Sequence, residues 1–285
     1  MTTVLQVSDP HFGTERAPVV EALLELAAHE RPDVLVLSGD ITQRARRGQF
    51  RAARAFVDRV AAPSRLAIPG NHDIPLFNLF ARVFAPYGGY QRAFGRDLEP
   101  ELDAPDVLVT CVNTTRPRRH KDGEVSTAQV ERVAARLRRA QPSQLRVVVV
   151  HQPVMAARPD DEPNLLHGRA DAVRAWVTAG ADLVMGGHIH WPYARSLRLG
   201  YGDLPRDAWI VQAGTAVSSR TRDGVPNSVN LLRCEASPAA RRCRIERWDY
   251  AGAERAFRCV EHHEVEFGGL RENDHGRDAG QAAQA

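Results

Sequence analysis

Residues 34–40 read Val-Leu-Val-Leu-Ser-Gly-Asp, an apolar run that ends in a serine, a glycine and an aspartate. An uninterrupted apolar run with alternating β-branched residues predicts a strand that is covered on both faces, as in a parallel sheet. Ligands of such sheets gather where strands end and loops begin, so we expect Asp40 at the edge that carries chemistry. This pairing of a buried strand with a polar motif decides the fold, because it recurs along the chain.

Four other apolar runs are followed by polar motifs in the same way. Val4–Val7 precedes Asp9-Pro10-His11, Leu66–Ile68 precedes Gly70-Asn71-His72-Asp73, Val147–Val150 precedes His151, and Leu183–Met185 precedes Gly187-His188-Ile189-His190. Taken singly, each motif is weak, since Gly-Asp is a common turn and a lone histidine at a strand end is usually structural. Their ordered recurrence, each behind a predicted strand, indicates that distant loops meet at one site.

The remaining pattern predicts helices in the first two-thirds of the chain and strands afterwards. Pro18 suits the start of a helix that runs to about residue 30, and Ser126 with Gln129 forms a capping box. A strand is also expected at Val107–Val112. Five later strands are expected at Ala194–Leu199, Trp209–Val217, Val229–Cys234, Arg244–Tyr250 and Phe257–Phe267. Strand–helix alternation followed by strands predicts an α/β fold of two packed sheets with helices outside.

We expect residues 1–268 to form one domain, with an excursion at 74–106 and a polar, disordered tail at 269–285. The excursion holds six aromatic residues, namely Phe77, Phe80, Phe84, Tyr87, Tyr90 and Phe94. They could form a small core of their own. Because the segment leaves directly from Asp73, it could equally be a lid or wall beside the site, and the two readings are compatible.

Bulk properties point to a cytoplasmic protein with buried free thiols. The sequence shows no signal peptide and no apolar stretch long enough to cross a bilayer. Cys234 and Cys243 could face each other across a hairpin, although none of the four cysteines forms a C-x-x-C pair. A net charge of +3 on 285 residues does not indicate nucleic-acid binding. The sequence does not fix the oligomeric state, and a homodimer is compatible with it.

The five motifs together offer carboxylate, imidazole and one amide oxygen as ligands. This mixture of hard and borderline donors suits a pair of divalent first-row ions better than a thiolate site. Two metal ions held close together are a device for cleaving phosphate esters. The residues therefore predict a reaction class, phosphoric ester hydrolysis, more readily than they predict a substrate.

In order, the motifs spell D-x-H, G-D, G-N-H-[DE], a histidine and G-H-x-H. With them the chain resembles the calcineurin-like metallophosphoesterase superfamily from residue 4 to about residue 217. The resemblance implies a four-layer αββα sandwich of two mixed β-sheets flanked by helices, which agrees with the α/β class expected above. It suggests manganese and iron as the two metals, and zinc also fits the ligands chemically.

The resemblance also distributes the ligands over two metal ions. One ion would be held by Asp9, His11 and His190, the other by Asn71, His151 and His188, and Asp40 would bridge both. A bridging carboxylate holds two cations at the ~3.5–4 Å separation used for in-line displacement at phosphorus. Water between two cations loses a proton far more easily than in bulk, so a metal-bridging hydroxide is the expected nucleophile.

By the same analogy, His72 would face the substrate phosphate rather than a metal, stabilise developing charge and protonate the leaving oxygen. Asp73 could accept a hydrogen bond from His72 and keep it protonated, or could cap a helix that starts after Ile74. Five weaker candidates lie in nearby loops, namely Arg44, Asn113, Thr114, Arg116 and His167. His262 and His263 read as solvent-facing strand positions.

Within the superfamily, the short motifs resemble those of class III cyclic nucleotide phosphodiesterases. The chain lacks the G-D-x-x-D-R-G continuation of protein phosphatases, because Ile41-Thr42-Gln43-Arg44 follows Asp40. We therefore expect a phosphodiesterase for small diesters, with 3′,5′-cyclic nucleotides as the family-based substrate. The alternatives are a lipid-linked pyrophosphate, a glycerophosphodiester or a nucleic-acid end as substrate. A third reading is a non-catalytic scaffold, although scaffolds of this fold typically lack ligands that are all present here.

Overall fold

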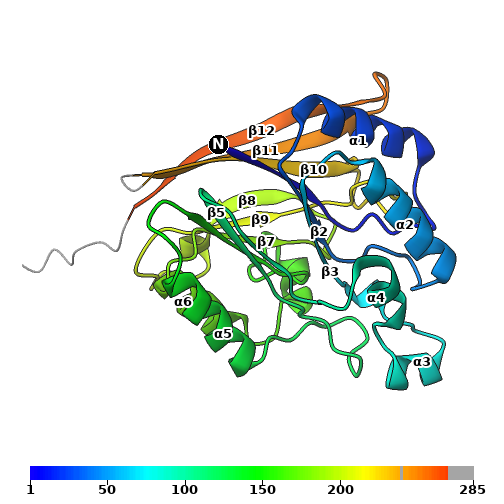
Figure 1. Ribbon diagram of the computed structural model, residues 1–285, viewed down its shortest axis with the longest axis horizontal. Coiled ribbons are helices and arrows are strands. Elements are labelled where there is room, and N and C mark those ends of the chain that lie inside the picture. Colours follow the sequence, from blue (N-terminus) through cyan, green and yellow to red (C-terminus); the bar gives the residue numbers. More distant parts are fainter. Residues whose placement is uncertain (238–239, 269–285) are drawn as a thin grey trace, which may run out of the picture.

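Two six-stranded sheets lie face to face, and helices cover the outer face of each one (Figure 1). The computed structural model describes residues 1–237 and 240–268. The expected four-layer αββα sandwich of mixed sheets is confirmed. The tail predicted to be disordered at 269–285 lies outside the described residues.

The first sheet has a parallel half and an antiparallel half. Its strands in spatial order are β12 (Ala256–Phe267), β11 (Arg241–Ala251), β10 (Ser228–Ala236), β1 (Thr2–Val7), β2 (Val34–Ser38) and β3 (Ser64–Ile68). β1, β2 and β3 run parallel to one another, while β10, β11 and β12 pair antiparallel. The three parallel strands therefore deliver their carboxyl ends to the same edge.

The second sheet repeats this arrangement with its own parallel centre. Its strands in spatial order are β4 (Glu101–Asp103), β5 (Val107–Cys111), β6 (Leu145–Val149), β7 (Leu183–Gly186), β9 (Trp209–Gln212) and β8 (Tyr193–Ser196). β5, β6, β7 and β9 are parallel, and the edge strands β4 and β8 are antiparallel. Two predicted strands were too long, since Ala194–Leu199 ends in the 3₁₀ turn η3 (Leu197–Leu199) and Trp209–Val217 stops at Gln212.

Alternate residues of each buried strand enter two different cores. In β2, Leu35 and Leu37 pack under the helices, whereas Val34 and Val36 lie between the two sheets. Burying a side chain of this size stabilises the fold by about 1.5–3 kcal/mol, so a strand covered on both faces is held firmly. The loops at its end are therefore anchored on a rigid frame.

Helices α1, α2 and α4 cover the first sheet, and α5 and α6 cover the second. The helices span α1 (Ala17–Glu30), α2 (Arg47–Arg59), α3 (Leu79–Phe84), α4 (Gly88–Phe94), α5 (Thr127–Arg138) and α6 (Arg169–Thr178), with 3₁₀ turns η1 (Asn71–Asp73) and η2 (Pro159–Asn164). The capping box of Ser126 and Gln129 starts α5 as predicted. No helix in residues 1–237 or 240–268 is long and apolar enough to cross a membrane.

The excursion at 74–106 does not form a core of its own around all its aromatics. Tyr90 and Phe94 pack against the core beneath α1 and α2, but Phe77, Phe80 and Phe84 are exposed. The expectation of a separate small core is wrong for these three residues, because α3 stands away from both sheets (Figure 1). Whether the segment acts as a lid stays a prediction.

Two side-chain expectations outside the site can also be checked. Cys234 and Cys243 are directly opposed across β10 and β11, with their Sγ atoms 4.0 Å apart and both thiols buried and free. His262 is exposed on β12 as expected, but His263 is half-buried, because its ring lies against Trp209 with the two ring centroids 5.2 Å apart. Neither pair lies near the loops described next.

Candidate metal centre

The loops that follow β1, β2, β3, β6 and β7 converge at one end of the two sheets. They bring together every residue predicted as a metal ligand, namely Asp9, His11, Asp40, Asn71, His151, His188 and His190. Asp9, His11 and His151 are fully buried, while Asn71 and His188 are partly exposed toward a cavity of about 420 Å³. The site is therefore a pocket with a buried floor and an open mouth.

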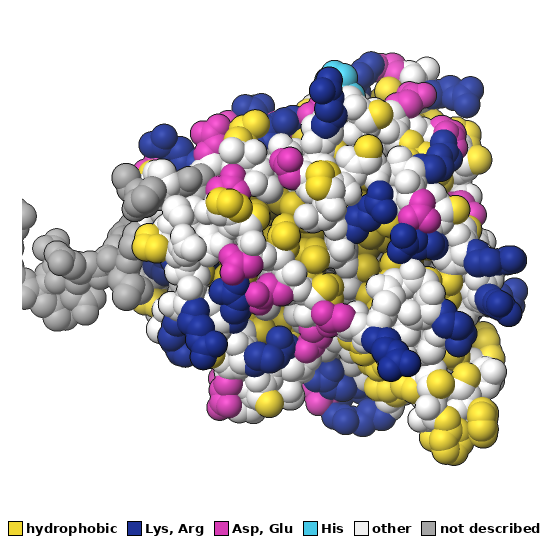
Figure 2. Space-filling model, in the orientation of Figure 1, with side chains coloured by type: hydrophobic (Ala, Val, Ile, Leu, Met, Phe, Trp, Pro, Cys, Tyr) yellow, Lys and Arg dark blue, Asp and Glu magenta, His cyan; other side chains and the backbone are white. Residues whose placement is uncertain are grey.

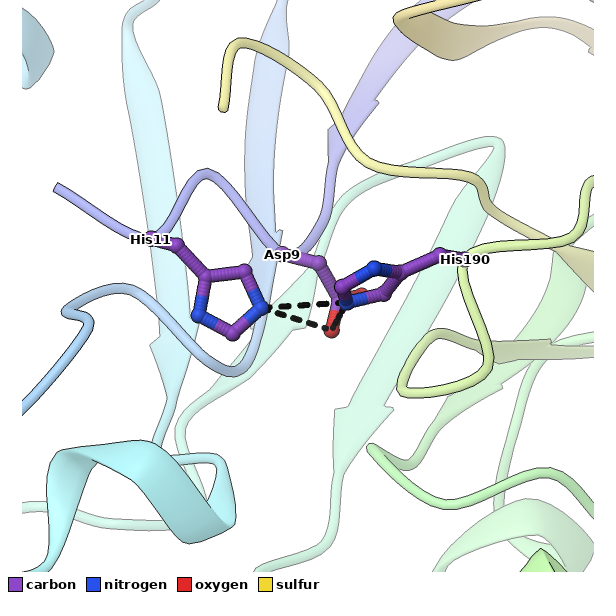
Figure 3. A group of neighbouring side chains, drawn as sticks. All are labelled: Asp9, His11 and His190. Atoms are coloured by element: carbon purple, nitrogen blue, oxygen red, sulfur yellow. Dashed lines mark hydrogen bonds and ion pairs between the residues drawn. The ribbon is translucent and has the colours of Figure 1, made fainter. Parts of the chain in front are cut away.

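Asp9, His11 and His190 form the first group of facing side chains (Figure 3). The Nε2 atoms of His11 and His190 lie 3.0 Å apart, and Asp9 Oδ1 lies 3.3 Å from His190 Nε2 and 3.8 Å from His11 Nε2. Three donor atoms that come this close from two loops, one after β1 and one after β7, are suitably placed for one cation.

Asp40, His151 and His188 form the second group. Asp40 Oδ1 lies 3.3 Å from His151 Nε2, and the rings of His151 and His188 meet edge to face with centroids 5.1 Å apart. The other carboxylate oxygen, Asp40 Oδ2, lies 3.8 Å from His11 Nε2 in the first group. Asp40 thus stands between the two groups, with one oxygen toward each.

The polar atoms on this floor lack ordinary hydrogen-bond partners. Buried side-chain atoms without any partner include Asp9 Oδ1, Asn71 Oδ1, His151 Nε2 and both ring nitrogens of His188. Leaving a buried polar atom unsatisfied costs about 1–3 kcal/mol, so such atoms rarely cluster without a reason. A cation beside each group would satisfy carboxylate, amide and imidazole lone pairs together. The donor set therefore fits two divalent ions.

Backbone carbonyls orient three of the imidazoles. Nδ1 of His151 donates to the Ser38 carbonyl at 2.9 Å, and Nδ1 of His190 donates to the Arg220 carbonyl at 2.7 Å. A histidine held through Nδ1–H keeps Nε2 free as a ligand, which is the usual arrangement around protein metal sites. His72 is held in the same way by the Gln43 carbonyl at 2.9 Å.

The backbone at this edge is strained. Five of the seven expected ligands have positive φ angles, at Asp9 (50°), His11 (41°), Asp40 (48°), His188 (76°) and His190 (56°). Positive φ in a non-glycine residue costs on the order of 1–3 kcal/mol and concentrates at functional sites. The loops after β2 and β3 also pack closely against each other at this edge. There is no room for a side chain at Gly70, because a Cβ there would lie 2.2 Å from Asp40 Oδ1.

Electrostatics divide the four histidines into two kinds. Burial lowers the pKa of His11 and of His188 to about 3, so both are neutral at neutral pH. Burial would also lower the pKa of His151, but the carboxylates of Asp40 and Asp9 outweigh it and raise that pKa to about 9. The pKa of His190 is raised as well, because the nearby carboxylate of Asp9 outweighs the cost of burial.

Asp73 does not contact the ring of His72, so the expected hydrogen bond between them is wrong. Its carboxylate accepts bonds from the backbone N–H groups of Gly70, Ile41 and Thr42 at 2.7–3.0 Å, and from the Thr42 hydroxyl at 2.8 Å. Asp73 does not cap α3 either, because that helix starts at Leu79 with Asn78 as its cap. Burial and the charge of Asp40 raise the pKa of Asp73 to about 6. Asp73 therefore ties together the loops that follow β2 and β3.

His72 lines the cavity as expected, and its ring partner is a residue that the motifs did not reveal. Arg220 donates from Nη1 toward His72 Nε2 at 3.2 Å and toward Gln43 Oε1 at 3.2 Å. Arg222, His120 and Lys121 also line the cavity, and Arg222 is held by Asp161 at 2.5 Å. These residues belong to two loops without any recognisable motif.

The five weaker candidates lie away from the ligand groups. Asn113 bonds to Thr115, Thr114 bonds to Gln152, and Arg116 donates to backbone carbonyls and Gln129, so these three support a loop. Arg44 lies over the ring of Phe77 at 5.3 Å, and His167 lies 3.9 Å from Asp122. None of the five lines the cavity, which agrees with the view that they are surface or supporting residues.

Comparison with known proteins gives one family and several similar folds. Residues 2–192 match the family model described as calcineurin-like phosphoesterase. No curated protein sequence matches the chain. A purple acid phosphatase from yellow lupin (Lupinus luteus) superposes with a TM-score of 0.69 at 12% identity, over 92% of this chain and 53% of the lupin chain. This chain thus spans about half the length of that phosphatase.

Two smaller structures are similar over nearly their whole length. Vps29 from Entamoeba histolytica, solved with Zn²⁺, has a TM-score of 0.48 at 12% identity, over 94% of this chain and 100% of its own. The phosphoesterase YfcE from E. coli has a TM-score of 0.43 at 15% identity, over 92% and 98%. At these identities the likeness concerns the fold alone.

Proposed function

The chain belongs to the calcineurin-like phosphoesterase family, and from that premise we propose that it hydrolyses small phosphodiesters at a pair of metal ions. The observation that carries the proposal is the pair of buried Asp/His groups that meet at Asp40 with unsatisfied atoms facing inward. 3′,5′-Cyclic nucleotides are the first substrates to consider, because the motifs resemble those of class III phosphodiesterases.

The proposed ligands follow the two groups. One ion would be held by Asp9, His11 and His190, the other by Asn71, His151 and His188, with Asp40 serving both. Bound divalent ions would supply Lewis-acid polarisation of the phosphoryl group and a strongly acidified water. Manganese, iron and zinc all accept this mixture of oxygen and nitrogen donors. Asp40 is the residue on which the whole arrangement depends, because each of its oxygens faces a different group.

Beyond the ligands, Arg220 and His72 would act on the substrate itself. Arg220 presents a guanidinium beside His72 at the cavity wall, and such a fork binds two phosphate oxygens at once. His72 donates Nδ1–H to Gln43, so Nε2 is the atom that can carry a proton to the leaving oxygen. A bound phosphate anion would attract the guanidinium of Arg220 away from His72. Nε2 of His72 would then be free to take up a proton, so substrate binding would prepare His72 to act as the acid.

Asp73 would act only through its position. Its four hydrogen bonds hold the turn that carries Asn71 and His72 against the turn that carries Asp40. Ligand turns placed by buried hydrogen bonds keep reacting groups aligned within the narrow tolerance that catalysis needs. We therefore assign Asp73 as a positioning residue in place of the catalytic role first expected.

The cavity favours a small substrate. Its volume of about 420 Å³ lies within the range of small-molecule pockets. Of the cations that line it, Arg222 is already paired with Asp161, which leaves Arg220, Lys121 and the adjacent His120 to face an anion.

A substrate panel tests the proposal. The protein, freed of metal and reloaded with Mn²⁺, would be assayed on bis-aryl phosphates, aryl monophosphates, cyclic nucleotides, a lipid-linked pyrophosphate, a glycerophosphodiester and single-stranded DNA. We expect diesters to be cleaved best, with Asp40→Ala as the inactive control. Exclusive cleavage of monoesters, of the pyrophosphate or of DNA would replace the proposed substrate class. Metal binding without turnover of any compound would favour a scaffold.

A further inference from the structure

The segment around α3 exposes a cluster of large apolar side chains, which we call the α3 ridge. It consists of Phe77, Leu79, Phe80, Val83 and Phe84. Each is 70–79% exposed, and together they are five of the seven large apolar side chains this exposed in the described part of the chain. In Figure 2 apolar atoms gather at the lower right, where Figure 1 places α3. Soluble proteins seldom leave such a contiguous patch without a use.

Arginines surround the ridge, and carboxylates are missing from the neighbouring segments. Residues 41–57 contain five arginines, residues 74–96 contain three, and neither segment contains Asp or Glu. The guanidinium of Arg44 lies 5.3 Å from the ring centroid of Phe77, which joins the basic surface to the ridge. Four of these eight arginines, namely Arg47, Arg51, Arg54 and Arg92, line a groove between α2 and α4. Of these, Arg54 is paired with Asp58 at 2.7 Å.

From this combination we propose that the α3 ridge docks the protein on an anionic lipid bilayer. Exposed phenylalanines and leucines insert among acyl chains, while flanking arginines face lipid phosphates, as in interfacial membrane segments. A second copy of the chain is a poor partner, because pairing two ridges would bring two sets of arginines together. The docking is peripheral, since α3 spans only six residues.

The ridge is also connected to the cavity. Arg82 of α3 donates to the Arg119 carbonyl at 2.7 Å, and the Tyr87 hydroxyl bonds Thr115 Oγ1 at 2.9 Å. The loop that they hold continues to His120 and Lys121 at the cavity wall. Docking would therefore bring the cavity mouth toward lipid headgroups. That consequence rests on the proposed function, whereas docking itself does not.

Vesicle flotation of the full chain tests the docking directly. We expect binding to vesicles that contain phosphatidylglycerol and phosphatidylcholine, weakening with added salt, and none to phosphatidylcholine alone. The variant Phe80→Ser/Phe84→Ser should lower the partition coefficient at least about tenfold. Leu199→Ser, at an equally exposed apolar position elsewhere, is the matched control and should bind like the parent.

Two further variants separate the charge from the apolar contribution. Arg47→Gln/Arg51→Gln should weaken binding to anionic vesicles, while Arg242→Gln on β11 should leave it unchanged. All substituted side chains are at the surface, so thermal unfolding should match the parent. Hydrolysis of a soluble diester without vesicles should also persist in the phenylalanine variant, which separates failure of docking from failure of the proposed function.

The docking proposal is overturned if the parent does not float with anionic vesicles, or if the phenylalanine variant floats as well as the parent. It is equally overturned if light scattering shows a dimer that Phe80→Ser/Phe84→Ser dissociates while no vesicles are bound. The last result would assign the ridge to self-association.

Discussion

Binding of Mn²⁺ to the metal-free protein at pH 7 should displace between one and two protons from the four histidines of the proposed site, apart from the proton that a bridging water would lose. The count follows from the surroundings of each imidazole. His11 and His188 have pKa values lowered to about 3 by burial, so they have no proton to lose. His151 has its pKa raised to about 9 by Asp40, and the pKa of His190 is raised by Asp9. Only these two carry protons that a metal must displace.

The magnitude can be worked out for His151. Its Nδ1–H is committed to the Ser38 carbonyl, so the extra proton sits on Nε2, the atom proposed to bind metal. A folded-state pKa raised to about 9 means that the proton is bound below that pH and lost as pH rises through it. Two pH units below the pKa, its removal costs about 2.7 kcal/mol, so affinity should be ~100-fold weaker at pH 7 than on the plateau above pH 9.

Isothermal titration calorimetry in buffers of different ionisation enthalpy counts the released protons. The plot of apparent affinity against pH should rise about tenfold per unit between pH 7 and pH 8 for the ion held by His151. His151→Gln should release one proton fewer, which assigns the step. Release near zero would show that Asp40 and Asp9 do not keep His151 and His190 protonated at pH 7. Release near four would show that burial does not keep His11 and His188 neutral.

Three substitutions test the roles of single residues. Asp40→Ala should lose both ions by elemental analysis and nearly all turnover, and retention of full metal and rate would refute the shared ligand. His72→Ala should keep both ions yet slow hydrolysis by about 10²–10⁴-fold, more for poor leaving groups; an unchanged rate with a poor leaving group would remove its role as an acid. Gly39→Ala should cost about 2–5 kcal/mol in thermal or urea unfolding, because φ is +100° and a Cβ would lie 2.4 Å from His151 Nδ1. Gly48→Ala in α2, with no atom within 4 Å of the added carbon, is the control and should unfold no more easily than the parent, because alanine favours a helix over glycine.

Much of the frame could be predicted because the relevant signals are local. β2 and the Gly-Asp motif that follows it are read from seven consecutive residues, and apolar periodicity marks β1, β3, β6 and β7 in the same way. Placing polar motifs at the ends of parallel strands then brings the expected ligands together without knowledge of any tertiary contact. The capping box that starts α5 was predictable for the same reason, since its two residues are three positions apart.

The errors concern residues whose roles depend on distant partners. Asp73 bonds backbone groups 31 and 32 residues away, and no short pattern distinguishes that use from a helix cap. Arg220 reaches His72 across 148 residues of sequence, from a loop that is fixed only when β10 pairs with β1. For the ridge aromatics a small core and a lid were both open readings, and composition alone cannot say which face a six-residue helix presents, although aromatic side chains are buried on average.

The backbone strain at the site must be offset by the stability of the surrounding fold. Five residues at positive φ cost on the order of 5–15 kcal/mol together, which equals the whole net stability of a typical domain. Backbone hydrogen bonds between the loop after β1 and the loop after β2 hold these turns. The Asp9 N–H donates to the Gly39 carbonyl at 3.1 Å, and the His11 N–H donates to the Asp40 carbonyl at 3.1 Å. The His188 N–H donates to Asp9 Oδ2 at 2.9 Å. Packing of the two sheets offsets this strain, so the fold itself holds in position the side chains that we propose as ligands.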